Sequence, residues 1–261
     1  MVPSSAEASQ RTETTGLPLK VHRVTTSDQQ AGLTLDQLRE WLGAPRLGKY
    51  LAAAGGHPGK ALALYRWNAD VAAAALLEVG HFEVALRNAY DQHLSAVYPN
   101  WAADLSSALF ARAIGSQAAR APQLTLNSGS LDKLAEAHRR INGPVTHGQA
   151  MAALDFGFWA TLTRRERTAT FWTPMLSRAF PTAITRGEVH DRADNLRKFR
   201  NRLAHNEPVF STRTGLAARM QDLRTTFAWI RPEVAIWVQT RSRVPALAAA
   251  CPIPGLLPTI P

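Results

Sequence analysis

Apolar residues recur every three to four positions through most of the segment 32–251, and this spacing is typical of amphipathic α-helices. Thr34 is the expected N-cap of the first helix, because Leu35, Leu38 and Leu42 follow it at helical spacing. The pattern shows no set of alternating strands separated by turns. We therefore predict an all-α fold built as a helical bundle.

Proline and glycine divide the helical segment into elements. Pro58 suits the first turn of a long helical stretch, Gly80 is a point where this stretch bends or divides, and Pro99 ends the region. We expect another helical stretch over residues 101–121, followed by a polar loop at residues 125–129. Further helices are predicted to begin after Ser130 as N-cap, to cover residues 185–203 and 216–230, and to begin again at Pro232.

The two ends of the chain differ from its centre. Residues 1–31 are rich in Ser, Thr, Gln and Glu and lack sustained apolar periodicity, so we predict a disordered tail. Residues 252–261 hold four prolines and a glycine, which exclude a regular helix and predict a Pro-rich tail. The expected organisation is one all-helical domain over residues 32–251 between these two tails.

Composition limits the compartment and the chemistry. Cys251 is the only cysteine, which excludes an internal disulfide and any zinc site built from several thiolates, and favours a cytoplasmic location. The longest apolar run, residues 71–77, is too short to cross a bilayer, so we expect no membrane span. The histidines lack the spacing of a compact metal site, and no cofactor motif is present, so neither metal nor cofactor is expected.

Net charge points to a polyanionic partner. The formal charge is +10, and residues 185–261 alone carry twelve Lys or Arg against six Asp or Glu. Nucleic acid is the first partner to consider, because phosphate backbones are the commonest cytosolic polyanion. The nucleotide composition of the genome would also give an Arg- and Ala-rich chain without any functional reason, and both interpretations stay open.

An aromatic block surrounds a basic cluster in the middle of the chain. Aromatic residues at 156–159 and 171–172 lie on either side of the basic residues 164–167. Aromatic side chains contribute most through burial, so we favour packing in the core over a platform that stacks nucleobases.

The stretch 195–208 concentrates charge around one histidine and is the best candidate for chemistry. Metal-free cleavage of RNA requires removal of a proton from a ribose 2′-hydroxyl, stabilisation of the crowded phosphate and protonation of the leaving 5′-oxygen. Histidine exchanges protons near neutral pH, and arginine presents a charged fork to phosphate oxygens. Arg200 and His205 are therefore the predicted catalytic pair.

Helical geometry restricts how this pair can act. At roughly 100° per residue, Arg200 and His205 are separated by about 140° around a straight helix. Convergence requires either a distorted helix end or contributions from two chains across a dimer. Asn201 shares a face with His205 and is expected to orient the imidazole or to contact phosphate, and Arg197 extends that face by one turn.

These residues resemble the Abi-like proteins of the HEPN superfamily, which share an Arg, four to six residues, and then His. The resemblance rests on three segments and spans residues 35 to about 238: Glu83-Val84-Ala85-Leu86-Arg87-Asn88, Phe156-Gly157-Phe158-Trp159 and Arg200-Asn201-Arg202-Leu203-Ala204-His205. It implies a HEPN-like bundle with additional helices. One departure is Asn206, where many relatives have a second histidine, so an auxiliary proton-transfer role is not expected there.

The resemblance implies a metal-independent endoribonuclease, often homodimeric, that acts as a toxin in phage defence or growth arrest and is restrained by an antitoxin protein. Arg200 would stabilise phosphate and His205 would transfer protons. Glu83 and Arg87, four residues apart, have the spacing of a structural ion pair. In the family, this pair and Asn88 would support the cleft.

The expected supporting or RNA-binding residues are Asn201, Arg197, Arg202, Glu83, Arg87 and Asn88. Cleavage through the 2′-hydroxyl would leave a 2′,3′-cyclic phosphate and a 5′-hydroxyl. The main alternative is a catalytically inactive module that binds RNA or a protein, and a third is a structural regulator with no affinity for RNA.

Overall fold

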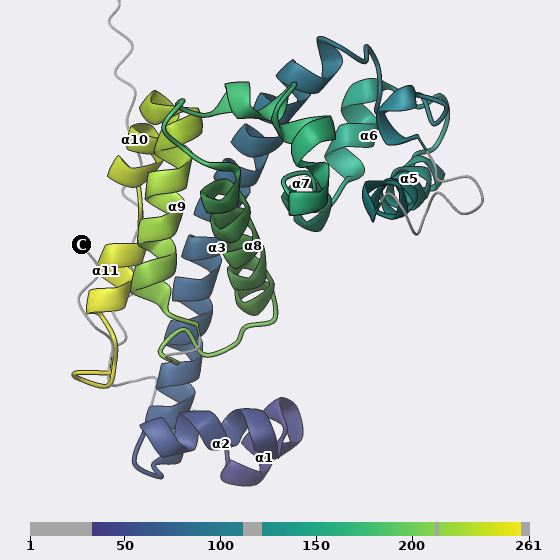
Figure 1. Ribbon diagram of the computed structural model, residues 1–261. Helices are drawn as coiled ribbons and strands as arrows, with labels where there is room; N and C mark the ends of the chain where they lie inside the picture. Colours follow the sequence, from purple (N-terminus) through teal and green to yellow (C-terminus); the bar gives the residue numbers. More distant parts are fainter. Residues whose placement is uncertain (1–32, 112–121, 212–213, 257–261) are drawn as a thin grey trace, which may run out of the picture.

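The computed structural model describes residues 33–111, 122–211 and 214–256 (Figure 1). Within these ranges all regular structure is helical and no β-strand is present, which confirms the predicted all-α class. The predicted tail over residues 1–31 lies outside the described residues, as do residues 257–261. The described part of the C-terminal tail forms no regular helix, as expected.

The long helix α3 (Pro58–Ser95) packs against more of the other elements than any other helix does. Pro58 occupies its first turn, as predicted. The helix runs through Gly80 without interruption, so the expected division there is wrong. Gly80 is exposed, whereas Val79 and Phe82 beside it are fully buried. Tertiary packing of these neighbours outweighs the cost of about 1 kcal/mol for one glycine in a helix.

The other helices lie along α3 and at its two ends (Figure 1). The α1–α2 hairpin packs at the N-terminal end of α3, α8 and α9 lie alongside it, α10 and α11 are on the outer side, and α5 to α7 lie toward its C-terminal end. Their bounds are α1 (Leu35–Leu42), α2 (Ala44–Ala53), α5 (Pro122–Arg139), α6 (His147–Ala153), α7 (Phe156–Thr161), α8 (Arg186–Ala204), α9 (Leu216–Ile230), α10 (Pro232–Thr240) and α11 (Val244–Ala249). Four short helical segments also lie within the described residues: η2 (Ala108–Phe110), η3 (Arg165–Arg167), η4 (Thr168–Trp172) and η5 (Leu176–Ala179).

Local capping signals located several helices correctly. Thr34 caps α1 and Thr185 caps α8, each in a capping box with the residue three positions later. The aromatic block packs in the core, as favoured from the sequence: Phe158, Trp159 and Phe171 are buried. Within the described ranges, no helix has the length and apolar character needed to span a membrane.

Two predicted boundaries in the centre of the chain are wrong. The polar loop expected at residues 125–129 is part of α5, and Ser130 lies inside this helix instead of capping one. The reason is a buried cation: the guanidinium of Arg167 donates to Asn127 at 3.3 Å and to Ser130 at 2.7 Å. Asn127 and Ser130, whose polar character is typical of loops, therefore serve as buried hydrogen-bond partners of Arg167.

The helix expected over residues 101–121 is not present in its described part, residues 101–111, which form turns and the short η2. Asp104 accepts hydrogen bonds from the backbone N–H and the hydroxyl of Ser106. Such local bonds compete with helical ones and favour turns. The remainder of this prediction, residues 112–121, lies outside the described residues.

Candidate active site

Helix α8 carries the predicted catalytic segment on a rigid base. Its apolar residues before the last position follow a helical period and are buried: Val189, Ala193, Leu196, Phe199 and Leu203. This face packs against α3, α7 and α9. The opposite positions are accessible, and Arg200, Asn201 and His205 are exposed.

The end of α8 is regular. The backbone N–H of His205 donates to the carbonyl of Asn201 at 3.0 Å, which continues the helical ladder to the last residue. Glu207 N–H then donates to the Arg202 carbonyl and Asn206 N–H to the Leu203 carbonyl, each at 2.9 Å. This pair of bonds is a Schellman motif with His205 as the C-cap.

Asn206 has the backbone conformation that the motif requires, with φ of 51°. Asn adopts this left-handed conformation more readily than most residues that have a side chain. Asn206 therefore has a structural role, because it ends the helix and fixes where His205 lies.

Arg200 and His205 project from different sides of α8. The distorted helix end that would allow their convergence is not present, because α8 remains helical up to Ala204. The two side chains therefore leave the helix about 140° apart. The first of the two arrangements expected from the sequence, a distorted helix end, is therefore not observed, and the second, a site shared between two chains, stays a prediction.

A buried asparagine, Asn68 of α3, anchors the loop that follows His205. Its Nδ2 donates to Asn206 Oδ1 at 3.0 Å and to the Glu207 carbonyl at 3.3 Å, while its Oδ1 accepts from the Val209 N–H at 2.7 Å. Asn68 is fully buried, so these bonds form away from water. Asn68 was not identified from the sequence, and no motif marks it.

Arg200 lies in a separate cluster of charged residues with α3 and the start of α7. Burial raises the pKa of the Glu83 carboxyl above its ordinary value, and the positive charges of Arg200 and Arg87 act in the opposite direction. Asp155, the N-cap of α7, also interacts electrostatically with Arg200. The buried Nε of Arg87 has no hydrogen-bond partner among the described residues.

Lys133 of α5 and Arg197 of α8 complete this charged cluster. Lys133 contacts both carboxylate oxygens of Asp155 at 3.1 Å. A Cβ on Gly157 would lie 3.0 Å from Asp155 Oδ1, closer than Cβ atoms usually approach other atoms, so glycine leaves room for the carboxylate that Lys133 contacts. Lys133 and Asp155 were not identified from the sequence, because nothing local links residues on different helices.

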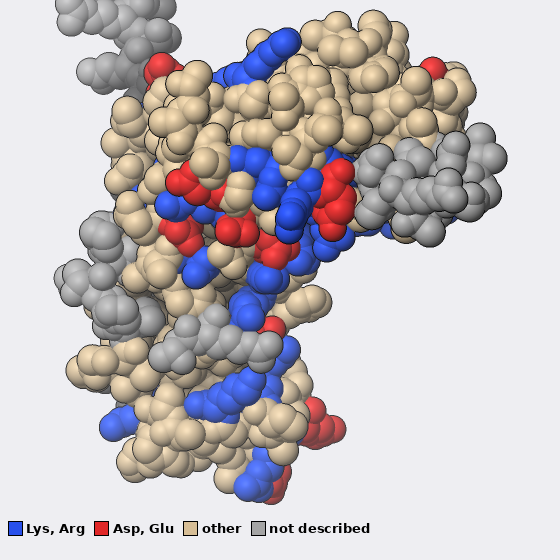
Figure 2. All heavy atoms as spheres, viewed as in Figure 1, with Lys and Arg blue, Asp and Glu red and all other residues tan. Residues whose placement is uncertain are grey.

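The remaining predicted residues have defined positions. Arg197 binds Asp194 through Nε at 3.0 Å and Nη2 at 2.8 Å, and Arg202 forms a longer contact of 3.5 Å with Glu207. Asn88 is exposed on α3. Lys and Arg side chains gather on the face shown in Figure 2, interspersed with acidic residues. Among the described residues, no group of three or more His, Cys, Asp or Glu is arranged to hold a metal ion.

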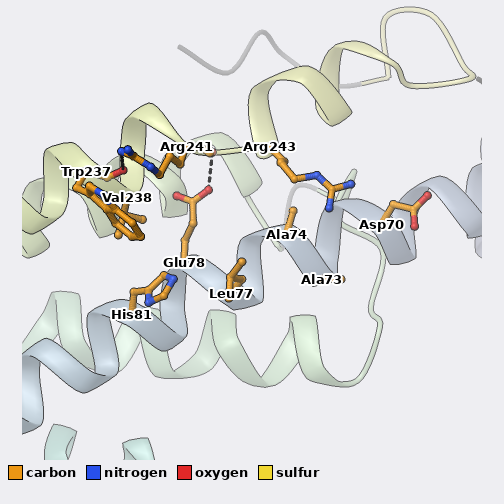
Figure 3. A pocket seen from close by; sticks show the side chains of 11 residues that line it. Asp70, Ala73, Ala74, Leu77, Glu78, His81, Trp237, Val238, Arg241 and Arg243 are labelled. Carbon is orange, nitrogen blue, oxygen red and sulfur yellow. Dashed lines mark hydrogen bonds between the residues drawn. The ribbon is translucent and has the colours of Figure 1, made fainter. Parts of the chain in front are cut away.

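A cavity of about 310 Å³ lies elsewhere, between α3 and the α10–α11 region (Figure 3). None of its lining residues comes from α8. The buried carboxylate of Glu78 accepts a hydrogen bond from Ser242, and His81 and Trp237 lie nearby with their rings edge to face. Burial raises the pKa of Glu78 above its ordinary value of 4.5, although Ser242, Arg224 and His81 lower it.

Glu78→Gln is expected to stabilise the protein at pH 8. The folded state holds the Glu78 proton more tightly than the unfolded state, so stability falls as the pH rises from 4.5 through the raised value. The variant should melt a few degrees higher at pH 8, since 1 kcal/mol shifts Tm by about 2–4 °C at this size. Near pH 4 the two proteins should melt together. Calorimetry checks this, with the exposed Glu40→Gln as control; equal Tm values at pH 8 would contradict it.

No family model, curated protein or solved structure matches this chain. The class that the structure defines is an all-α protein whose central helix supports a charged helix with an exposed, anchored histidine at its end.

Proposed function

We propose that this chain is a metal-independent endoribonuclease of the Abi-like branch of the HEPN superfamily. The observation that carries the proposal is the placement of His205, exposed at the end of α8 and fixed by a Schellman motif and the buried Asn68. Exposed Arg200 on the same helix and the net charge of +10 also support it.

In the proposed reaction, His205 removes the proton from a ribose 2′-hydroxyl, whose oxygen then attacks the adjacent phosphorus. The P–O5′ bond breaks as the P–O2′ bond forms, and the leaving 5′-oxygen takes a proton from water. Arg200 stabilises the charge on the phosphate oxygens. The products are a 2′,3′-cyclic phosphate and a 5′-hydroxyl, and DNA is not cleaved because it lacks the attacking group. Two chains form the site, with Arg200 from one and His205 from the other. In this proposal the enzyme is a cytoplasmic toxin in phage defence or growth arrest, restrained by an antitoxin.

Purified wild-type protein is expected to cleave total RNA in EDTA and to leave cyclic phosphate ends. His205→Ala should lower the rate by about 10²- to 10⁴-fold, the usual contribution of general acid–base catalysis. The matched control is His81→Ala, which removes an exposed histidine beside the cavity at α10 and should leave the rate unchanged. Cleavage that persists in His205→Ala would contradict the assigned role.

The second candidate is a catalytically inactive RNA- or protein-binding module. The observation that favours it is the divergence of Arg200 and His205 on a regular helix, since a single chain does not bring them together. A binding module would retain RNA in both the wild type and His205→Ala, and neither protein would generate cyclic phosphate ends.

A further inference from the structure

The α1–α2 hairpin reaches the end of α8 at the candidate catalytic histidine. Arg46, in the first turn of α2, donates from Nη2 to the backbone carbonyl of His205 at 3.2 Å. Arg46 and Lys49 of the same helix are both exposed. Since an arginine offers five N–H donors, the hydrogen bond to His205 uses only part of what this side chain presents.

Four aromatic rings connect the same hairpin to α3 and to the loop after His205. Trp41 contacts Tyr65 with 5.3 Å between ring centroids, Tyr65 contacts Tyr50 at 5.3 Å, and Tyr50 contacts Phe210 at 5.5 Å. All three pairs meet edge to face at 78°. Tyr50 is fully buried, but Trp41 is 57% exposed, so the series ends in a ring that is open to solvent.

The register of α3 places this open ring close to His205. Tyr65, which contacts Trp41, and Asn68, which binds Asn206, are three residues apart and therefore neighbours on one side of α3. Their separation along the helix axis is about 4.5 Å. Trp41 and the residue after His205 thus contact α3 on adjacent turns.

An open aromatic ring beside exposed cations is the arrangement that binds single-stranded nucleic acid, in which bases stack on the ring and phosphates contact Lys or Arg. Lys and Arg side chains are visible both beside α7 and α8 and over the α1–α2 hairpin (Figure 2). A tryptophan normally contributes most when it is buried, and the hairpin instead leaves Trp41 more than half exposed.

We infer that Trp41, Arg46 and Lys49 form a binding subsite for single-stranded RNA next to His205. The ring of Trp41 stacks on one base, and the two cations hold the neighbouring phosphates. The inference rests on the proposed function and assigns the α1–α2 hairpin to positioning the substrate at the same site. Because every base has a face that stacks, this subsite favours unpaired RNA and has little preference for its sequence.

The test uses the full-length His205→Ala protein, in which cleavage is expected to be at least about 10²-fold slower, and a fluorescein-labelled single-stranded RNA of twelve nucleotides. Adding Trp41→Ala is expected to raise the Kd, measured by fluorescence anisotropy, by about 5- to 150-fold, the range that stacking of one base supplies. Trp41→Phe should restore part of the affinity. The matched control is Trp237→Ala, because Trp237 is 51% exposed on α10 and lies outside the subsite.

The cations are tested through the salt dependence of the same binding. Arg46→Ala or Lys49→Ala should each reduce the slope of log K against log salt by about 1, because each removes one phosphate contact. Thermal melting of every variant checks that it is folded. In active wild-type protein, Trp41→Ala should raise KM for a short single-stranded RNA more than it lowers kcat.

The outcomes separate this inference from the proposed function. If folded Trp41→Ala binds the RNA as tightly as its parent while the wild type cleaves RNA, the subsite is overturned and the ribonuclease stands. If the wild type generates no cyclic phosphate ends, but Trp41→Ala still weakens binding, the subsite stands in a protein that only binds RNA. An unchanged Kd in all three hairpin variants shows that Trp41 serves another contact, such as a protein partner, and rejects the inference.

Discussion

Two inactive variants, Arg200→Ala and His205→Ala, are expected to recover ribonuclease activity when their subunits are exchanged. Arg200 and His205 diverge by about 140° on a helix that stays regular to Ala204, so we expect one chain to supply Arg200 and the other to supply His205 to one phosphate. In a mixed dimer, one shared cleft receives both intact residues and the other receives neither. Random pairing then gives about a quarter of the wild-type rate.

The control for this prediction is a chain that carries both substitutions. Exchanged with an equal amount of wild type, it should leave about a quarter of the clefts active if they are shared, because every mixed dimer then has one defective residue in each cleft. About half would remain if each chain acted alone. Tagging one of the two chains verifies exchange. Absence of recovery in verified mixed dimers contradicts a shared cleft.

The helices that position the site were predictable where their signals are local. Residues 185–203 were predicted as a helix and α8 spans Arg186–Ala204, while the predicted range 216–230 coincides with α9. The α8 boundary depends on a cap and an apolar period within a few residues of sequence. The same stretch carries Arg200 and His205, so the chemistry-bearing residue types could be identified without the structure.

What the sequence could not provide was the pairing between distant segments. Asn68 binds residues almost 140 positions later, and Lys133 binds Asp155 from a different helix. Neither contact follows from periodicity or capping, which describe neighbours in the chain. The error at Ser130 has the same origin, since the buried partner Arg167 lies 37 residues away.

The geometry at the end of α8 could not be predicted from the sequence for another reason. The residues after His205 were compatible both with a distorted helix end and with a regular one. The regular end forms because Asn206 adopts a left-handed conformation while its side chain accepts a hydrogen bond from Asn68. A tertiary contact thus selects between two local conformations, and the regular one favours the proposed site shared between two chains.

Asn68→Ala is expected to destabilise the fold and to abolish cleavage. The reason is that one side chain, that of Asn68, forms hydrogen bonds with three groups in the loop after His205. The substitution leaves the Val209 N–H buried without its partner, which costs about 1–3 kcal/mol. The Asn206 side chain and the Glu207 carbonyl also lose a donor. Urea unfolding should therefore show a loss of about 2–4 kcal/mol with little change in slope.

Activity distinguishes an anchor for His205 from a general stabilising residue. At a temperature where Asn68→Ala is folded, its cleavage rate should fall by at least about 10²-fold, since misplacement by 1 Å can cost this much. Asn142→Ala, which alters an exposed loop asparagine, should leave both properties unchanged. A folded Asn68→Ala protein that cleaves RNA at the wild-type rate would show that His205 does not need this anchor. The fixed end of α8 would then no longer support the proposed mechanism.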